Sequence, residues 1–510
     1  MSQSLPDPTT RMFLTISALA AVMMTTLDGT IAVIALPRIQ SNLSASHEQI
    51  AWVLTSYLVA AAIATPLSGW LADRFGRVRI MALGVAGFTL ASLACGLSAN
   101  IEMLVVSRFL QGLFGACLVP LSQVLLLDIY PPEKQGPAVA WFGIGCLMGP
   151  MIGPTLGAWL TEYFSWRWIF LINAPVGVMA CIGLLTFGRG QVVNTAVRSF
   201  DARGFAMLSI ALAAFQLMLD RGQLLDWFDS TEILAEATIA GLFLYLFVVH
   251  VLTARDPFIK PAIFRDWNFF IGIALSIVLG VFLNGVIPIV TSMMQQLYGY
   301  PIMMAGYLSL PRAMGNMVAV FMAGRLVSRV EPHYILFCGM LLLVWSLVIL
   351  AGLSVDSRPD LLALVALLQG VGSGFLFLPL MMIMFATLPS NLRNEASTVS
   401  ALMRSLGGAV GISLIQTMTI RDTAAVQARL AEGVRPDNPL ADWRWSGLES
   451  LDPAVVGSAL SEVARQATMA AYVDSFRVLL VMAICAAPLA LVMRPSRHRL
   501  PMANVQVHVD

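Results

Sequence analysis

The stretch Met12–Pro37, MFLTISALAAVMMTTLDGTIAVIALP, decides the fold because it is apolar throughout except for one acid, Asp28. At about 1.5 Å per residue, a helix of this length crosses a hydrocarbon core of about 30 Å. An ionisable side chain inside a transmembrane helix is costly to bury and therefore indicates a functional site. The alternative is that Asp28 lies near the membrane interface or caps a neighbouring helix.

The composition extends this interpretation to the whole chain of 510 residues. Hydrophobic residues make up 58% of it and charged residues 12%, and the mean hydropathy is +0.80. A water-soluble protein of this length would expose many of these apolar groups, so lipid is the expected solvent. The formal net charge of +1 excludes nucleic acid as a partner. The six cysteines are scattered singly, so neither a metal site nor a disulfide framework is expected.

Apolar windows of about 20 residues recur along the chain and predict an all-α membrane protein. We expect fourteen transmembrane helices, near 12–37, 50–71, 79–98, 103–128, 138–161, 167–187, 204–220, 232–252, 268–291, 302–324, 334–353, 360–386, 396–420 and 475–493. Basic residues gather in the loops on the same side as the N-terminus, so the positive-inside rule predicts that both termini are cytoplasmic.

An internal repeat predicts two bundles of six helices. Gln111–Gly115 is echoed by Gln369–Gly374, which is the trace that a parallel duplication of a six-helix unit leaves. Chance similarity of glycine-rich apolar segments is the alternative. The predicted parts are an N-terminal bundle at 12–187, two inserted transmembrane helices at 204–252 and a C-terminal bundle at 268–493.

The predicted C-terminal bundle includes a long extracytoplasmic loop, 421–474. It contains helix-like runs such as AAVQARLAEG and VGSALSEVARQ. It is either a partly ordered surface loop or a docking surface for an extracytoplasmic partner.

Arg108 in the fourth span is the predicted partner of Asp28. Counted from the ends of their helices, both residues lie in the outer half of the membrane, so a direct or water-bridged pairing is expected. The repeat places Ala366 where the first half has Arg108, which argues against a symmetric structural role. An arginine beside an acid tunes its proton affinity, so we predict that this pair couples transport to protons. A lipid-snorkelling arginine is the alternative.

The loop between the second and third spans is predicted to act as a gate. Asp73 is placed to accept from an arginine across the two halves or to cap the third helix. Positive-inside anchoring is the alternative interpretation of its arginines. The predicted gating residues are Gly69, Asp73, Arg74, Gly76 and Arg77.

The fifth span combines glycines at every fourth position with two prolines. Such a stripe lets another helix approach backbone to backbone, and the prolines soften the helix. We expect this helix to lie at the contact between the two halves, although close packing alone would explain the glycines. Its predicted residues are Gly145, Gly149, Pro150, Gly153, Pro154 and Gly157.

Four further polar residues are candidates for lining a central cavity: Thr30, Gln111, Arg312 and Arg404. Three deep arginines against one acid favour lipophilic neutral or weakly acidic substrates over dications.

Four of these stretches resemble motifs of the major facilitator superfamily. Gly69–Arg79 resembles its loop motif between helices 2 and 3, and Leu104–Ala116 resembles its helix 4 motif. Gly145–Gly157 resembles its antiporter motif, which symporters and facilitators generally lack. Leu27–Pro37 resembles the helix 1 motif of fourteen-helix drug:proton antiporters, except that Val33 stands where that motif usually has Asn.

Three more stretches, Trp166–Asn173, Leu219–Gly222 and Asp226–Phe228, are similar to EmrB-type multidrug exporters. The resemblance implies a proton-driven antiporter that exports lipophilic drugs by alternating access and uses the proton gradient instead of a cofactor. It also implies a Gram-negative inner membrane, with a periplasmic adaptor and an outer-membrane channel as partners in a tripartite system.

Two other functions stay open. One is a dedicated exporter of an endogenous metabolite, such as a fatty acid, a siderophore or an antibiotic. The other, more remote, is a multi-span membrane enzyme, for which we find no His/Asp, Ser/His or metal-ligand constellation at a membrane face.

Overall fold

The computed structural model describes residues 6–131, 134–188, 200–327, 329–389, 392–433 and 453–494, and all regular structure in these ranges is helical. Backbone groups in lipid must be satisfied within a segment, which is why apolar runs of this length become helices. The first helices are α1 (Pro8–Asn42), α2 (His47–Phe75), α3 (Arg77–Gly96), α4 (Ile101–Gly115), α5 (Leu118–Ile129), α6 (Gln135–Tyr163), α7 (Trp168–Leu171) and α8 (Asn173–Phe187).

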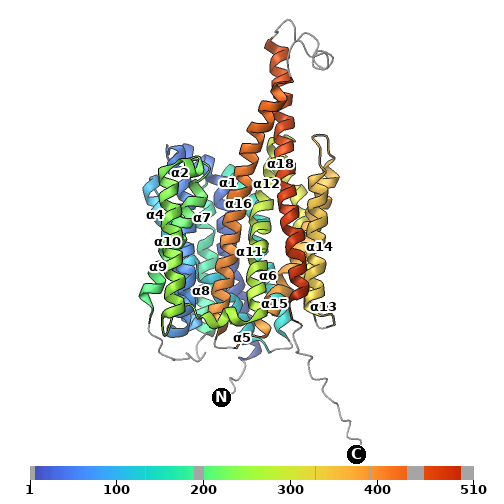
Figure 1. Cartoon of the computed structure of the whole chain (residues 1–510). Helices are drawn as coiled ribbons and strands as arrows, with labels where there is room; N and C mark the ends of the chain where they lie inside the picture. The colour runs from blue at the N-terminus through green and yellow to red at the C-terminus, as the bar shows by residue number, and fades with distance from the viewer. Residues whose placement is uncertain are drawn as a thin grey trace, which may run out of the picture.

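The chain continues with α9 (Ala202–Arg221), η2 (Trp227–Asp229), α10 (Thr231–Thr253), η3 (Pro261–Arg265), α11 (Trp267–Val281), η4 (Phe282–Val286), α12 (Ile287–Gln296) and α13 (Ile302–Leu326). The last helices are α14 (Pro332–Ala351), α15 (Pro359–Ala386), α16 (Arg393–Ala431) and α18 (Pro453–Val492). The long helices run side by side as one bundle (Figure 1).

Eleven helices of the described ranges are long and apolar enough to cross a membrane, judged by length and composition. The other predicted spans, 138–161, 268–291 and 302–324, are also helical, as α6, as α11 to α12 and as α13, but fall outside that group. The all-helical membrane fold is therefore confirmed, whereas the number fourteen stays a prediction.

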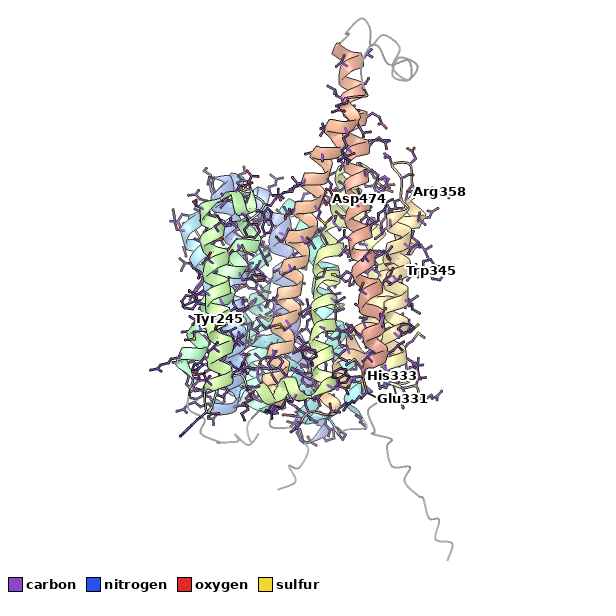
Figure 2. All side chains as sticks on the ribbon, viewed as in Figure 1. Tyr245, Glu331, His333, Trp345, Arg358 and Asp474 are labelled. Carbon is purple, nitrogen blue, oxygen red and sulfur yellow. The ribbon has the colours of Figure 1, made fainter. Side chains whose placement is uncertain are left out.

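Large apolar side chains cover the outer surface of the bundle at mid-height. Tyr245 and Trp345 are 66% and 62% exposed, and both project outward between the charged ends (Figure 2). Glu331 and His333 lie at one end, and Arg358 lies toward the other (Figure 2). Apolar surface on this scale is stable only against lipid.

The helices α16 and α18 are much longer than a membrane crossing requires, with 39 and 40 residues. Their far ends project beyond the other helices as a pair, on the side opposite to the start of α1 and the end of α18 (Figure 1). Both helix-like runs expected in the loop 421–474 lie on this protrusion, and the polar stretch 434–447 lies outside the described residues.

The helices α9 and α10 pack together at one flank of the bundle (Figure 1). Ser413 of α16 donates to the carbonyl of Leu219 at 2.8 Å, and Trp227 donates to Thr417 at 3.1 Å. On the other side, Thr55 of α2 donates to Asp220. The inserted helices are thus held by helices of both predicted bundles.

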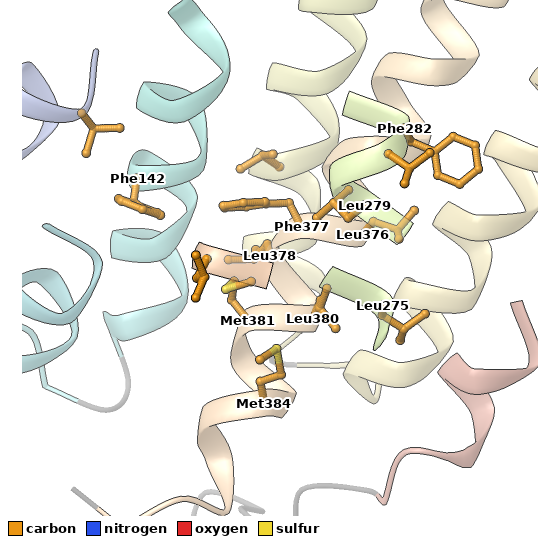
Figure 3. Packing of buried hydrophobic residues seen from close by; sticks show 14 of the residues in the cluster. Phe142, Leu275, Leu279, Phe282, Leu376, Phe377, Leu378, Leu380, Met381 and Met384 are labelled. Carbon is orange, nitrogen blue, oxygen red and sulfur yellow. The ribbon is translucent and has the colours of Figure 1, made fainter. Parts of the chain in front are cut away.

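The two predicted bundles meet where α6 faces α13 and α15. Phe142 and Phe377 stack with ring centroids 6.2 Å apart, within the apolar cluster shown in Figure 3. A β-carbon on Gly143 would lie 3.3 Å from the Phe377 ring, so the helices approach closely here.

Candidate functional site

The buried pair Asp28–Arg108 is the centre of the site. Asp28 comes from the middle of α1 and Arg108 from α4, and their side chains are 1% and 0% exposed. Arg108 Nη1 donates to Asp28 Oδ2 at 2.5 Å. The direct pairing expected from depth in the membrane is present, and the interpretation of Arg108 as a lipid-snorkelling residue is wrong.

The second carboxylate oxygen of Asp28 is held by two amides. Gln111 Nε2 donates to Oδ1 at 2.9 Å, and Asn173 Nδ2 of α8 donates to it at 3.2 Å. The same two nitrogens also lie within 2.7 and 2.9 Å of the Ser92 hydroxyl on α3. Four helices therefore contribute to one network around a charged carboxylate, which is how a buried charge becomes tolerable.

Arg108 is held on its other sides by α2 and by aromatic rings. Its Nε donates to the carbonyl of Val53 at 3.1 Å, and its guanidinium lies 4.5 Å from the centroid of Tyr57 and 5.5 Å from that of Phe170. Its Nη2 is buried without a recorded hydrogen-bond partner in the described residues. This Nη2 group could therefore donate to a further acceptor.

The glycine stripe of α6 packs against α1 and brings Thr30 beside the site. A β-carbon added to Gly149 would lie 2.4 Å from the backbone of Thr26, and one added to Gly153 would lie 2.1 Å from Thr30 Oγ1. Thr30 in turn donates to the Gly149 carbonyl at 3.2 Å.

The stripe itself therefore packs within the first predicted bundle, which is the close packing given above as the alternative for the glycines, while α6 as a helix does lie at the contact between the two halves. Gly145 and Gly157 also face α1, and α6 reaches the other bundle through Phe142 and Gly143 instead. The side chains of Pro150 and Pro154 lie outside the described residues.

The predicted gating loop is a tight turn between α2 and α3. Gly76 ends α2 with φ 92°, a conformation that favours glycine. Gly76 is also the N-cap residue of α3, and the two roles expected for Asp73, as a cap of this helix or as an acceptor for an arginine across the two halves, stay predictions. Arg77 pairs with Asp128 of α5, and the Arg74 guanidinium lies 5.6 Å from the ring centroid of Trp70.

Gly69 and Asp73 instead line a cavity between α2 and α16. Glu395 and Thr398 face them from α16, and Phe258 closes the cavity from the segment that follows α10. Residues of both predicted bundles thus meet where α2 ends and α16 begins.

The candidate cavity arginines lie away from the Asp28 network. Arg312 of α13 donates from Nη2 to Gln369 Oε1 of α15 at 2.9 Å. Arg404 of α16 lies over the Phe377 ring at 5.5 Å from its centroid. Neither arginine has a recorded ion pair in the part of the chain that the structure describes.

Sequence reasoning missed Ser92 and Asn173 as members of the network. Both are isolated polar residues in apolar helices, which was the available signal. Their convergence on Asp28 depends on the packing of α1, α3 and α8, which no local pattern specifies.

Comparison with known proteins agrees with this architecture. The sequence profile of the Major Facilitator Superfamily matches residues 18–412. The multidrug export protein EmrB of Escherichia coli K12 is 35% identical over 444 residues, 86% of each chain. The fatty acid resistance protein FarB of Neisseria gonorrhoeae is 33% identical over 425 residues, 83% of this chain and 84% of FarB.

Among solved structures, the proton:xylose symporter XylE is similar in fold, with a TM-score of 0.60 at 12% identity over 95% of this chain and 99% of that one. The Major Facilitator Superfamily is a family of membrane transporters without a resident cofactor, and not of enzymes. The multi-span membrane enzyme considered above is therefore excluded. The matched profile, the identity to EmrB and the shared fold together place this multi-pass membrane protein in the major facilitator superfamily, among the EmrB-type multidrug exporters.

Proposed function

We propose that this protein is a proton-driven antiporter that exports lipophilic compounds across a bacterial inner membrane by alternating access. The buried Asp28–Arg108 pair with its amide network carries this proposal. A lone carboxylate inside the membrane that is paired with an arginine is a typical proton-relay arrangement. The relatives named multidrug export protein support the direction of transport and the substrate class.

The network suggests how a proton and the site are coupled. Protonation of Asp28 neutralises the charge that Arg108, Gln111 and Asn173 hold. The guanidinium then keeps its contact with the Val53 carbonyl, and its Nη2, which has no recorded partner among the described residues, can donate to a new acceptor. The proton therefore changes the packing preference of α4 against α1, which is the kind of bias that a rocking transporter needs.

The cavity between α2 and α16 is the proposed cytoplasmic gate. Asp73 and Glu395 lie on opposite helices there, so the two carboxylates bring negative charge to the same gap. Both the start of α1 and the end of α18 lie at this end of the bundle (Figure 1). With the positive-inside rule, this supports cytoplasmic termini.

Transport by purified protein in proteoliposomes tests the proposal. An imposed pH gradient should drive uptake of lipophilic dyes and drugs by the wild type, and Asp28→Asn should lose gradient-driven transport while it elutes as folded protein. Asp360→Asn, at an exposed ion pair, is the matched control. If Asp28→Asn still moves a compound against its gradient, the coupling role is wrong.

The helical protrusion is the proposed docking site of a periplasmic adaptor that leads to an outer-membrane channel. Leu430, near the end of α16, and Leu460, near the start of α18, are 41% and 47% exposed. These ends of the two helices form the protrusion (Figure 1). Exposed apolar side chains of this kind mark interaction surfaces.

The variant Leu430→Glu/Leu460→Glu should lose drug resistance in cells and co-purification with the adaptor, yet transport normally in proteoliposomes. The variant Arg358→Gln, on a loop at the same end, should keep all three properties. Loss of transport in proteoliposomes would instead point to a structural role of the protrusion.

A dedicated exporter of fatty acids is the second candidate. The 33% identity to a protein named for fatty acid resistance favours it. Comparing the drug resistance of a deletion strain with its fatty acid resistance separates the two candidates.

A further inference from the structure

A small cavity inside the predicted C-terminal bundle is lined by a cation, and none of the described residues that line it carries a negative charge. Arg312, Ser346 and Gln369 line it from α13, α14 and α15, and Phe282 and Val286 line it from η4. Its volume is about 30 Å³, which is room for about two water-sized groups. Within the described residues, Arg312 has no recorded ion pair.

This cavity is the counterpart of the Asp28 network. The offset that carries Gln111 onto Gln369 also carries Asp28 onto Val286 and Arg108 onto Ala366. The same backbone approach recurs: a β-carbon on Gly112 would lie 2.4 Å from the Tyr57 carbonyl, and one on Gly370 would lie 2.0 Å from the Arg312 carbonyl. At the corresponding positions, the second half has the same glutamine, Gln369, but Val286 in place of the carboxylate. Its guanidinium, that of Arg312, lies on the neighbouring helix α13.

Two buried donors in this cavity, Arg312 Nε and Gln369 Nε2, have no hydrogen-bond partner among the residues that the structure describes. Gln369 is only 6% exposed. Its amide orientation is fixed because Oε1 accepts from Arg312 Nη2 at 2.9 Å, and a flipped amide would place donor against donor.

Neither lining serine is recorded as an acceptor for these two donors in the described residues. Ser346 donates to the Leu343 carbonyl at 2.7 Å, and Ser373 donates to the Gly370 carbonyl at 2.9 Å and accepts from Asn316 Nδ2 at 2.8 Å. Burying an unpaired donor is unfavourable, and burying an uncompensated cation more so.

The helix segment beside the cavity is a π-helix. Phe282 and Val286, at its two ends, both line the cavity. Single π-turns inside longer helices are frequent at functional sites because they interrupt the regular hydrogen bonding. The predicted N-terminal bundle has Asp28 at the corresponding place in the continuous helix α1.

We propose that this cavity binds the carboxylate head group of a lipophilic acid, so that the cargo supplies the negative charge that the described lining of the cavity lacks. The inference rests on the proposed export function and narrows its substrate class. Arg312 Nε and Gln369 Nε2 are two donors for two carboxylate oxygens, and a planar guanidinium suits this group. The apolar wall formed by Phe282, Val286 and Leu343 suits the carbons next to the head group.

Equilibrium binding tests this in the full chain in lipid nanodiscs at neutral pH, with no pH gradient, so that the result does not depend on proton coupling. Radiolabelled dodecanoate is the probe, and dodecanol is the neutral probe of the same chain length. Arg312→Gln should weaken dodecanoate binding at least about tenfold and leave dodecanol binding unchanged. Arg358→Gln, an exposed arginine, should bind both probes like the wild type.

A second variant protects the test against misfolding. Val286→Asp places a carboxylate at the position that corresponds to Asp28, beside Arg312. It should fold, since the new pair neutralises the guanidinium, and should lose dodecanoate binding because the site is filled from within. Retained dodecanoate affinity in both variants would overturn the proposal, as would an equal loss for dodecanol.

Exchange of chloride for gluconate distinguishes a small inorganic anion from the carboxylate. Dodecanoate affinity that stays the same in both salts supports the assignment. Displacement of dodecanoate by chloride, with chloride alone stabilising the protein against heat, overturns it in favour of an inorganic anion. The wild type can pass this binding test and still fail gradient-driven export, so the two proposals fail separately.

Discussion

Asp28 and Arg108 form an ion pair in which neither side chain has more than 1% of its surface exposed. Attraction between charges is strong in such surroundings, but so is the loss of hydration. The main constraint that the pair places on the molecule is therefore that neither partner can be removed alone without leaving the other charge buried and uncompensated.

A double-mutant cycle on this pair measures that constraint. Arg108→Leu alone should lower the free energy of unfolding by about 3–5 kcal/mol, since it leaves a buried carboxylate uncompensated. Asp28→Leu/Arg108→Leu should lose clearly less than the sum of the single changes. Thermal and denaturant unfolding in detergent give the values.

The exposed pair Arg358–Asp360 is the control for this cycle, with side chains 83% and 78% exposed. Its coupling should be at most about 1 kcal/mol. Equal coupling in the two pairs would contradict the importance given to burial.

Gly153 is predicted to be intolerant of any side chain. In Gly153→Ala the new β-carbon meets Thr30 Oγ1 at 2.1 Å, so α1 and α6 must separate, at a cost of about 1–3 kcal/mol. Gly157→Ala has its closest contact at 3.4 Å and should be neutral or more stable by up to about 1 kcal/mol. Thermal stability and transport should fall together in the first variant only, and adding Thr30→Ala should partly restore both.

Gly76 is predicted to be required for its backbone conformation. Its φ of 92° is strained for any residue with a β-carbon, so Gly76→Ala should destabilise the protein by about 1–3 kcal/mol. Gly241→Ala, in the middle of α10 with nothing within 4 Å, should stabilise it by about 0.5–1 kcal/mol. Unfolding midpoints of the two variants should therefore shift in opposite directions.

Asp201 gives the molecule a pH-dependent contribution to stability. The carboxylate caps α9 through the Gly204 amide at 2.9 Å and also accepts from the Phe258 amide at 3.0 Å. Burial alone would raise the pKa of Asp201, but these bonds and the contact with His250 lower it overall below its ordinary value of 3.8.

A carboxyl group with a lowered pKa stabilises the folded state above its unfolded pKa, and this stabilisation is lost as the pH falls through the folded pKa. Asp201→Asn should therefore be less stable than the wild type by about 0.3–1 kcal/mol at neutral pH, because the neutral amide can still cap α9 but lacks the negative charge at the helix N-terminus. The difference should shrink below about pH 4. The exposed Asp229→Asn should show no such convergence.

Much of the fold was predictable because lipid imposes strong rules on a chain. The apolar runs predicted the helices, and the position of one acid in α1 predicted the Asp28–Arg108 contact. Depth along a helix is nearly a local quantity, since each residue adds a fixed rise. The direction in which each face of a helix points is not a local quantity, so the sequence did not show that the glycines of α6 pack on α1 while Phe142 and Gly143 face the other half.

Polar partners contributed by distant helices were the least predictable part of the site. Nothing near Asn173 in the sequence indicates that it lies 3.2 Å from Asp28.

The unbroken course of α16 has a mechanical consequence. A helix of 39 residues is about 58 Å long, and a tilt of about 10° at one end sweeps the other through about 10 Å. Because helices resist bending, a small tilt of α16 among its neighbouring helices becomes a large displacement of its projecting end. A partner protein bound to that end would therefore be displaced back and forth by each such tilt.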